Sequence, residues 1–197
     1  MTRRIAHDQC LGAIIDVQDF LLDQVDKGLR PKLKTRIKQF ARLLGYFRVP
    51  IVVTLERSVD RKGRLPKEIK RHLGDSAEIF EKDYFDLTKE DDIAAQIARL
   101  KKKQAIVAGC ETDVCVLQSC LGLLDLGYEV FLVEEILFSS SRNVDAAIAR
   151  MQAEGAVLLS YKSLYYELIA AVDGGPHAEK LLQTFGPLPD DLPDAAA

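Results

Sequence analysis

Short apolar runs alternate with amphipathic segments along most of the chain. Five of these runs are predominantly apolar and bounded by turn residues, a pattern typical of strands buried on both faces of a parallel sheet. They cover residues 11–16, 50–55, 104–109, 128–133 and 156–159. A shorter apolar piece, Ile79–Phe80, stands apart from them.

Between these runs, apolar residues recur at intervals of three and four, which predicts amphipathic helices. The clearest helix extends from Pro31 to Phe47, with the proline in a favourable first-turn position. Further helices are predicted over residues 91–100, 113–126, 144–154 and 164–172. Strands alternating with helices predict an α/β fold, a three-layer doubly wound sandwich with a parallel sheet in the middle. Such sheets bind ligands beyond the carboxyl ends of their strands.

Two segments lack this periodicity. Glu56 to Gly74 is rich in charge and broken by Gly63 and Pro66, which predicts a long loop of the kind that often carries function. The last residues, GPLPDDLPDAAA, contain three prolines. We therefore expect a single domain over residues 1–197 that ends in an extended tail from about residue 183.

The charge balance narrows the set of partners. With 27 basic and 30 acidic residues, the net charge is −3 and the pI about 5.7, so no long-range positive field attracts nucleic acid or anionic lipid. Apolar stretches long enough for a signal peptide or a membrane span are missing. We expect a cytoplasmic protein that acts on a small molecule, without nucleic-acid or membrane partners.

Cys10, Cys110, Cys115 and Cys120 are predicted to be free thiols, because a chain with a large core and no export signal belongs in a reducing compartment. Their C-x4-C-x4-C spacing lacks the close pairs that enclose zinc, so no structural metal is expected.

Cys115 is the strongest candidate for chemistry. It lies in the segment Gly109–Val116, at the start of a helix that directly follows a buried strand. Backbone N–H groups and the helix dipole at this place favour a thiolate, lower the pKa of the thiol and can bind an oxyanion. The alternative is a small buried hydrophobic residue, and that interpretation is preferred for Cys110 and Cys120.

Asp16 ends an otherwise apolar strand, where a carboxylate is costly to bury without a partner or a task. It could accept the thiol proton, or it could be a cap or turn residue. Lys82 cannot be singled out by composition, since it is one of 27 basic residues.

Several motifs together resemble the isochorismatase-like cysteine hydrolases. They are IIDVQDF near the start, K-x-x-F-D at Lys82, G-x-x-T-D-x-C-V at Gly109, and then GYEVFLVEE and SSRNVDAAIARMQAEGA. The resemblance covers about residues 12–171. It is closest to the isochorismatase-domain-containing branch, whose substrates are largely unassigned.

This resemblance implies a Rossmann-like, six-stranded parallel sheet and a catalytic triad of Asp16, Lys82 and Cys115. It also implies a non-proline cis peptide at Cys110–Glu111, with the backbone N–H groups of Glu111 and Cys115 as the oxyanion hole. Family members are homo-oligomers, so a dimer or tetramer is expected. No cofactor is expected.

Three features depart from the family pattern, one of them Gln118 and Ser119 where the family commonly has Thr and Ala. Nicotinamidases have an Asp-x-His metal site where this chain has Thr54-Leu55-Glu56, so that metal should be absent. The first motif reads D-V-Q-D-F, one residue shorter than the usual D-x-Q-x-x-F.

The expected reaction is hydrolysis of an amide-type C–N bond through a thioester. Residues expected to line the substrate pocket, by their location, are Glu56, Arg57, Tyr84, Phe85, Phe138 and Ser139. Two alternatives stay open: a non-catalytic binding protein on the same fold, and a thiol redox sensor in which Cys110 or Cys120 resolves Cys115.

Overall fold

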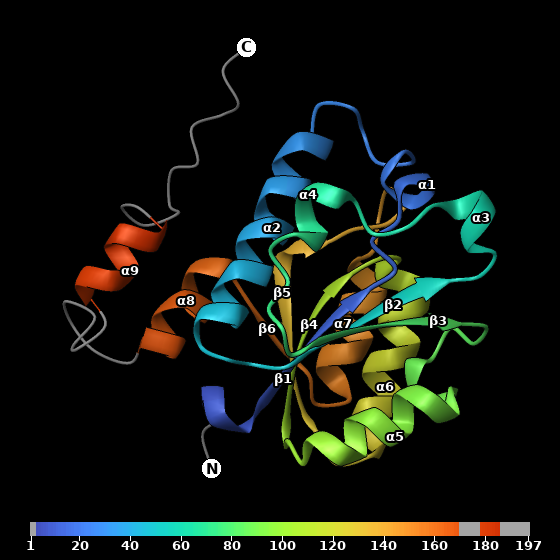
Figure 1. Ribbon diagram of the computed structural model, residues 1–197. Helices are drawn as coiled ribbons and strands as arrows, with labels where there is room; N and C mark the ends of the chain where they lie inside the picture. Colours follow the sequence, from blue (N-terminus) through green and yellow to red (C-terminus); the bar gives the residue numbers. More distant parts are fainter. Residues whose placement is uncertain (1–2, 170–177, 186–197) are drawn as a thin grey trace.

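The computed structural model describes residues 3–169 and 178–185 of the chain. Its described part contains one sheet of six strands, and every pairing between neighbouring strands is parallel. Across the sheet the order is β3-β2-β1-β4-β5-β6 (Figure 1). The strands are β1 Cys10–Ile15, β2 Ile51–Glu56, β3 Ala77–Lys82, β4 Gln104–Gly109, β5 Glu129–Leu137 and β6 Val157–Leu159.

Helices cover both faces of this sheet. Their bounds are α1 Asp19–Leu22, α2 Arg30–Tyr46, α3 Val59–Lys62, α4 Lys67–Lys70, α5 Asp91–Leu100, α6 Leu117–Asp125, α7 Asp145–Ala153, α8 Tyr161–Ile169 and α9 Ala178–Phe185. Helices α2 and α8 lie on one side, and α5, α6 and α7 on the other (Figure 1). The predicted three-layer α/β sandwich is therefore confirmed.

Alternation along the strands divides the apolar residues into two cores. Ile14 and Val53 pack in the core beneath α2 and α8, whereas their chain neighbours Ile15 and Val52 pack beneath α5 and α6. Successive side chains of a strand point to opposite faces, so a strand covered by helices on both sides must be apolar at every position. This requirement explains the continuous apolar runs of β1, β2 and β4.

The sixth strand, β3, follows from the family resemblance and not from the hydrophobic pattern. Only Ile79–Phe80 stood out in the sequence, because β3 is an edge strand and most of its residues are partly exposed. A strand at the edge needs fewer apolar side chains than a central one.

Some boundaries differ from expectation. The segment predicted as the loop 56–74 also contains the short helices α3 and α4. The last predicted helix, 164–172, begins earlier, at Tyr161, and residues 170–172 lie outside the described part of the chain. Of the expected tail, residues 183–185 belong to α9, which contacts α2 through a hydrogen bond from Arg42 to the Thr184 carbonyl. Residues 186–197 lie outside the described part.

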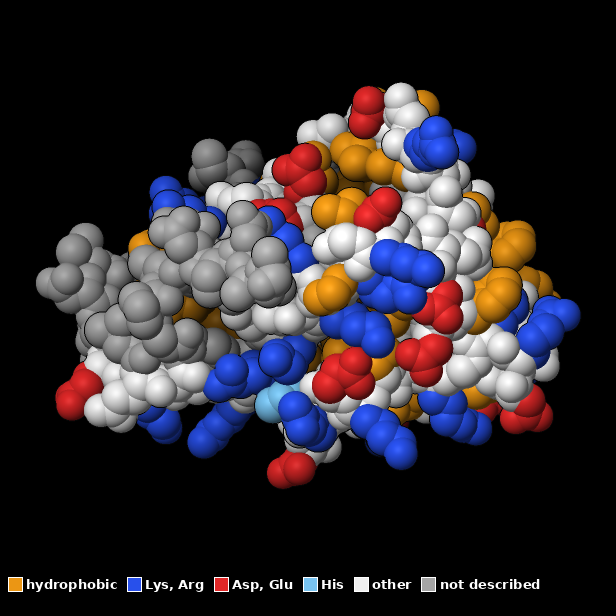
Figure 2. Space-filling view, turned by 90° about the horizontal axis from the view of Figure 1, so that it is seen from above, with side chains coloured by type: hydrophobic (Ala, Val, Ile, Leu, Met, Phe, Trp, Pro, Cys, Tyr) orange, Lys and Arg blue, Asp and Glu red, His pale blue; other side chains and the backbone are white. Residues whose placement is uncertain are grey.

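Charged side chains of both signs are interspersed over the face shown in Figure 2, with small hydrophobic areas between them. Among the described helices, none combines the length and the hydrophobicity that crossing a membrane requires.

Candidate active site

The site lies where the strand order reverses. Strands β1 and β4 are neighbours, but the chain leaves β1 toward β2 on one side and leaves β4 toward β5 on the other. Such a switch point opens a crevice at the carboxyl ends of the two strands. Asp16 directly follows β1, and the turn with Cys115 begins three residues after the end of β4.

Asp16 is fully buried and has a left-handed backbone conformation, with φ at 49°. Non-glycine residues rarely adopt this region, although aspartate tolerates it better than most. Its amide donates to the Thr54 carbonyl at 3.1 Å, and the Thr54 hydroxyl donates to Oδ1 at 2.8 Å. Strand β2 therefore fixes both the backbone and the carboxylate of Asp16.

Lys82 ends β3, in register with Glu56 on β2, and its side chain is fully buried. Its Nζ lies 2.7 Å from Asp16 Oδ2 and 3.5 Å from Cys115 Sγ. The ammonium also donates to the Tyr84 carbonyl at 3.1 Å. The structure thus brings together Asp16, Lys82 and Cys115, which are far apart in the sequence.

Cys115 lies in a π-helical turn, Thr112–Val116, that precedes α6. The turn is fixed by hydrogen bonds from the Val116 amide to the Glu111 carbonyl at 3.0 Å and from Thr112 to the Phe138 carbonyl at 3.0 Å. The peptide bond Cys110–Glu111 is cis, as the resemblance implies, and Arg57–Ser58 is a second non-proline cis bond.

Gly109 allows the close approach of the two strands beneath this turn. Its φ is 128°, and a Cβ there would lie 2.0 Å from the Ile15 carbonyl oxygen. No side chain fits at this contact, so the glycine is required by the geometry that places Cys115 beside Asp16.

Burial governs the protonation states of the site. It raises the pKa of the Cys115 thiol to about 12. The negative charge of Asp16 also raises this pKa, whereas the positive charge of Lys82 lowers it. Burial also raises the pKa of Asp16, although Lys82 and Thr54 oppose it. For Lys82, burial favours a lower pKa, but the charges of Asp16 and Cys115 outweigh it and the pKa is raised.

The expectation that the helix start lowers the pKa of Cys115 was wrong for the resting site. Cys115 is only 3% exposed and its sulfur faces a carboxylate, and desolvation penalises a charged sulfur. The resting form is therefore a neutral thiol beside an Asp16–Lys82 ion pair. All four cysteines are free, and Cys10, Cys110 and Cys120 are fully buried.

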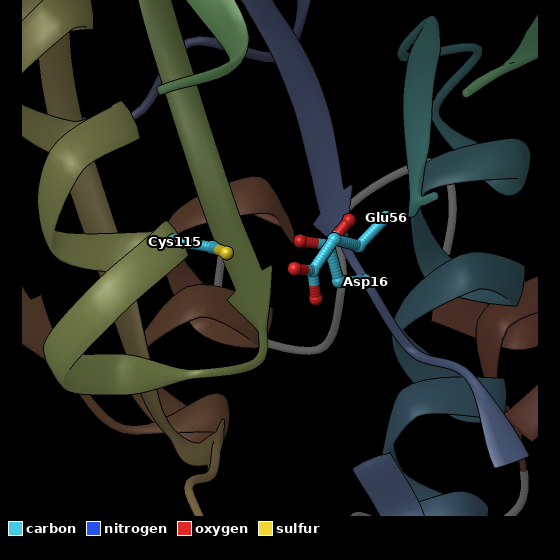
Figure 3. Close-up of side chains that lie close together, drawn as sticks. All are labelled: Asp16, Glu56 and Cys115. Carbon is cyan, nitrogen blue, oxygen red and sulfur yellow. The ribbon is translucent and has the colours of Figure 1, made fainter. Parts of the chain in front are cut away.

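Glu56, one of the residues expected to line a pocket, has a side chain that reaches the triad sulfur and carboxylate. One of its oxygens lies within 4.8 Å of both Cys115 Sγ and an Asp16 oxygen. In Figure 3 the carboxylates of Asp16 and Glu56 gather together and face the sulfur of Cys115.

The other expected pocket residues make different contacts. Arg57 forms ion pairs with Asp83 and Glu81. The side chains of Tyr84 and Phe85 are largely exposed, and Lys82 binds the Tyr84 carbonyl. Phe138 is buried, and its carbonyl accepts the hydrogen bonds of Thr112. Ser139 donates to Asp113 at 2.6 Å.

Gln18 is a site residue that sequence reasoning missed. Its buried amide accepts from the Glu56 N–H at 2.7 Å and donates to the carbonyls of Glu56 at 3.1 Å and Gly63 at 2.8 Å. The available signal was its place three residues after β1, in the motif IIDVQDF, where a buried amide needs partners.

Asp16, Glu56 and Cys115 also offer three potential metal ligands. The Lys82 ammonium lies 2.7 Å from an Asp16 oxygen and 3.5 Å from the Cys115 sulfur, so it already supplies the positive charge at these ligands and would repel a metal cation. The donor set therefore does not fit a metal centre.

Known proteins resemble this chain in sequence. The isochorismatase domain matches residues 13–163. The secreted isochorismatase effector Isc1 of Phytophthora sojae is 34% identical over 179 residues, which span 84% of this chain and 79% of that protein. The probable hydrolase YcaC of Escherichia coli is 26% identical over 166 residues, or 84% of this chain and 80% of YcaC.

Solved structures agree in fold. YcaC from Pseudomonas aeruginosa, determined with hexane-2,5-diol and covalent acrylamide, superposes with a TM-score of 0.81 at 27% identity and covers 95% of this chain and 99% of its own. The E. coli YcaC structure, described as an octameric hydrolase of unknown specificity, superposes with a TM-score of 0.80 at 23% identity, covering 94% of this chain and 97% of its own. The chain therefore belongs to the isochorismatase family of hydrolases.

Proposed function

We propose that this protein hydrolyses an amide-type C–N bond of a small molecule through a thioester on Cys115. The observation that carries the proposal is the position of the Lys82 ammonium, 2.7 Å from Asp16 and 3.5 Å from the Cys115 sulfur. In this buried cluster the thiol is the nucleophile, the carboxylate is its base, and the ammonium balances the negative charge.

In the first half-reaction Asp16 takes the proton of the thiol as the sulfur attacks the carbonyl carbon. The C=O electron pair moves to oxygen, and the backbone N–H groups of Glu111 and Cys115 bind this oxyanion. Asp16 then gives the proton to the departing nitrogen, the C–N bond breaks, and an acyl thioester stays on Cys115. Lys82 stabilises the negative charge as it moves between Asp16 and the sulfur.

In the second half-reaction Asp16 takes a proton from water, whose oxygen attacks the thioester carbonyl. The C–S bond breaks, the carboxylic acid leaves, and Asp16 returns its proton to the sulfur. The raised pKa of Asp16 supports this role, because a stronger base accepts the thiol proton more readily. The raised pKa of Lys82 keeps the ammonium charged throughout.

The covalent acrylamide in P. aeruginosa YcaC gives independent support. Acrylamide is a small primary amide whose alkene reacts with nucleophilic side chains. A covalent adduct on a relative at 27% identity is consistent with a reactive nucleophile in that protein.

The test is to trap the thioester. The wild-type protein is mixed with a panel of small primary amides, quenched in acid and examined by intact mass and peptide mapping. We expect an acyl adduct on Cys115, released as a hydroxamate by hydroxylamine, and ammonia formed at each turnover. Cys115→Ala should form neither, while the matched variant Cys120→Ala should form both. Hydrolysis by Cys115→Ala would overturn the assignment.

We further infer that the protein forms a homo-oligomer, a dimer or tetramer, and acts in the cytosol. Its octameric E. coli neighbour supports assembly, and four free thiols suit a reducing compartment. The name of Isc1 marks that relative as secreted, so the family is not confined to cells. Light scattering after size-exclusion chromatography tests the assembly, and a monomeric mass at working concentrations would contradict it.

A further inference from the structure

Glu56 lies on the solvent side of the buried triad. The side chains of Asp16 and Lys82 are 0% exposed, whereas that of Glu56 is 22% exposed. Exposure therefore increases from the ion pair toward Glu56. A small molecule that approaches the sulfur of Cys115 from solvent is expected to meet this carboxylate.

The position of Glu56 is fixed by its neighbours. Gln18 binds its N–H and its carbonyl, and Lys62 binds Oε1 at 2.8 Å. Lys62 is itself held by the Arg57 carbonyl at 2.9 Å. Within residues 3–169 and 178–185, the second carboxylate oxygen of Glu56 accepts no hydrogen bond. The side chain is held in place and keeps one acceptor available.

The spacing of the two carboxylates matches the leaving group of a primary amide. Oxygens of Asp16 and Glu56 lie within 4.8 Å of each other and of Sγ. An amide nitrogen is bonded to the carbon that the sulfur attacks, so it enters the space between these groups. Its two N–H bonds can then donate to two acceptors, one on each carboxylate.

We propose, building on the amide hydrolysis above, that Glu56 is a specificity-determining residue that selects primary carboxamides. It accepts one N–H of the –NH₂ group, while Asp16 accepts the other. Its charge repels acyl groups that carry a carboxylate beside the reacting carbon. N-alkyl amides lack the second N–H and lose this contact.

The charge selection can be measured on the thiol itself, without turnover. Iodoacetamide and iodoacetate are nearly the same size, but only iodoacetate is anionic. The rate constants for alkylation of Cys115 by each reagent are determined by peptide mass spectrometry. Cys110, Cys115 and Cys120 lie on one tryptic peptide, so fragment ions are used to localise the alkylation to Cys115.

Three variants separate the contribution of Glu56 from general charge effects. Glu56→Gln should lower the iodoacetamide-to-iodoacetate rate ratio about tenfold, since it removes one negative charge near the sulfur. Lys62→Met should raise this ratio, because it removes the counter-charge of Glu56. Glu78→Gln makes the same charge change at the opposite end of β3, where Glu78 pairs with Arg99, and should leave the ratio unchanged.

Turnover provides the second measurement. The kcat/KM of a primary amide relative to its N-methyl derivative should fall about tenfold in Glu56→Leu, mainly through KM, because leucine has no acceptor for the second N–H. A rate ratio within about twofold of wild type in a folded Glu56→Gln protein would overturn the role of Glu56. If wild type hydrolyses no amide, the hydrolase proposal fails, and the alkylation ratios still decide whether Glu56 sets the charge preference of the site.

Discussion

Lys82 Nζ lies 2.7 Å from Asp16 Oδ2, and both side chains are completely shielded from solvent. The two residues come from strands separated by β2, so the ion pair spans the carboxyl edge of half the sheet. A buried pair of this kind is costly to assemble and more costly to break, because one charge left alone in the interior has no compensation.

Lys82→Met should therefore destabilise the protein by about 3–5 kcal/mol and abolish turnover. Asp16→Asn added to Lys82→Met should recover a large part of the lost stability without activity, because no buried charge is then left unpaired. Asparagine suits the left-handed backbone at position 16. Urea unfolding of the single and double variants measures both effects. A double variant no more stable than Lys82→Met would show that the pair contributes little.

The pH dependence of kcat/KM should reflect the raised pKa values of the pair. Asp16 acts as a carboxylate, so activity should rise with pH through its pKa, with a midpoint above the ordinary 3.8. Lys82 acts as an ammonium, so activity should persist until the pH passes its pKa, which lies above 10.5. A rate profile from about pH 4 to about pH 11 measures both limbs.

Thr54→Val gives this profile a matched control. The Thr54 hydroxyl bond lowers the pKa of Asp16, so its removal should move the acid limb to higher pH and leave the alkaline limb in place. An acid limb that stays fixed in this variant would argue against Asp16 as the base.

Gly109→Ala should damage both stability and activity. A Cβ at this position would lie 2.0 Å from the Ile15 carbonyl, so β1 and β4 must separate just beneath the catalytic turn. Gly127→Ala is the matched control, because Gly127 also has a positive φ, of 82°, with no atom within 4 Å of the added Cβ. The control should lose about 1–2 kcal/mol from backbone conformation alone and keep its kcat/KM. Equal losses of stability in the two variants would contradict the role of close packing.

Gln18→Leu should destabilise the fold by about 1–3 kcal/mol for each buried partner left without a hydrogen bond. The variant should also alter substrate preference, because the Gln18 amide binds the backbone of Glu56. Gln96→Leu is a useful comparison, because it removes another largely buried amide, one that contacts Glu78 and Arg99. That variant should lose stability with unchanged preference in the alkylation assay. Unchanged preference in Gln18→Leu as well would show that Glu56 is positioned by other contacts.

Periodicity was sufficient for most of the fold. The segments that form β1, β2 and β4 are predominantly apolar because helices cover both faces of these strands. Their burial can therefore be predicted from the amino-acid sequence. The hydrophobic pattern of β3 is weak because an edge strand buries fewer of its side chains. Asp16 and Cys115 could be proposed from local context, as each follows a buried strand at the edge where ligands bind.

Lys82 could not be placed by local reasoning. In the sequence, a lysine at the end of an edge strand cannot be distinguished from a surface lysine. In the folded protein, Asp16 lies within 2.7 Å of its ammonium. Family resemblance pointed to Lys82, but its burial became visible only in three dimensions. The assignment of Glu56 as the neighbour of the sulfur likewise depends on the register of β2 against β1 and β3.

The α/β architecture and the two strand ends that carry Asp16 and Cys115 can be predicted from the amino-acid pattern, because burial and helix periodicity are local properties of the chain. The protonation state of the thiol depends on the folded protein. A helix start favours a thiolate, but the folded protein excludes water from the sulfur and places a carboxylate beside it, and the pKa rises to about 12. Desolvation and the charges of distant residues exist only once the strands have come together.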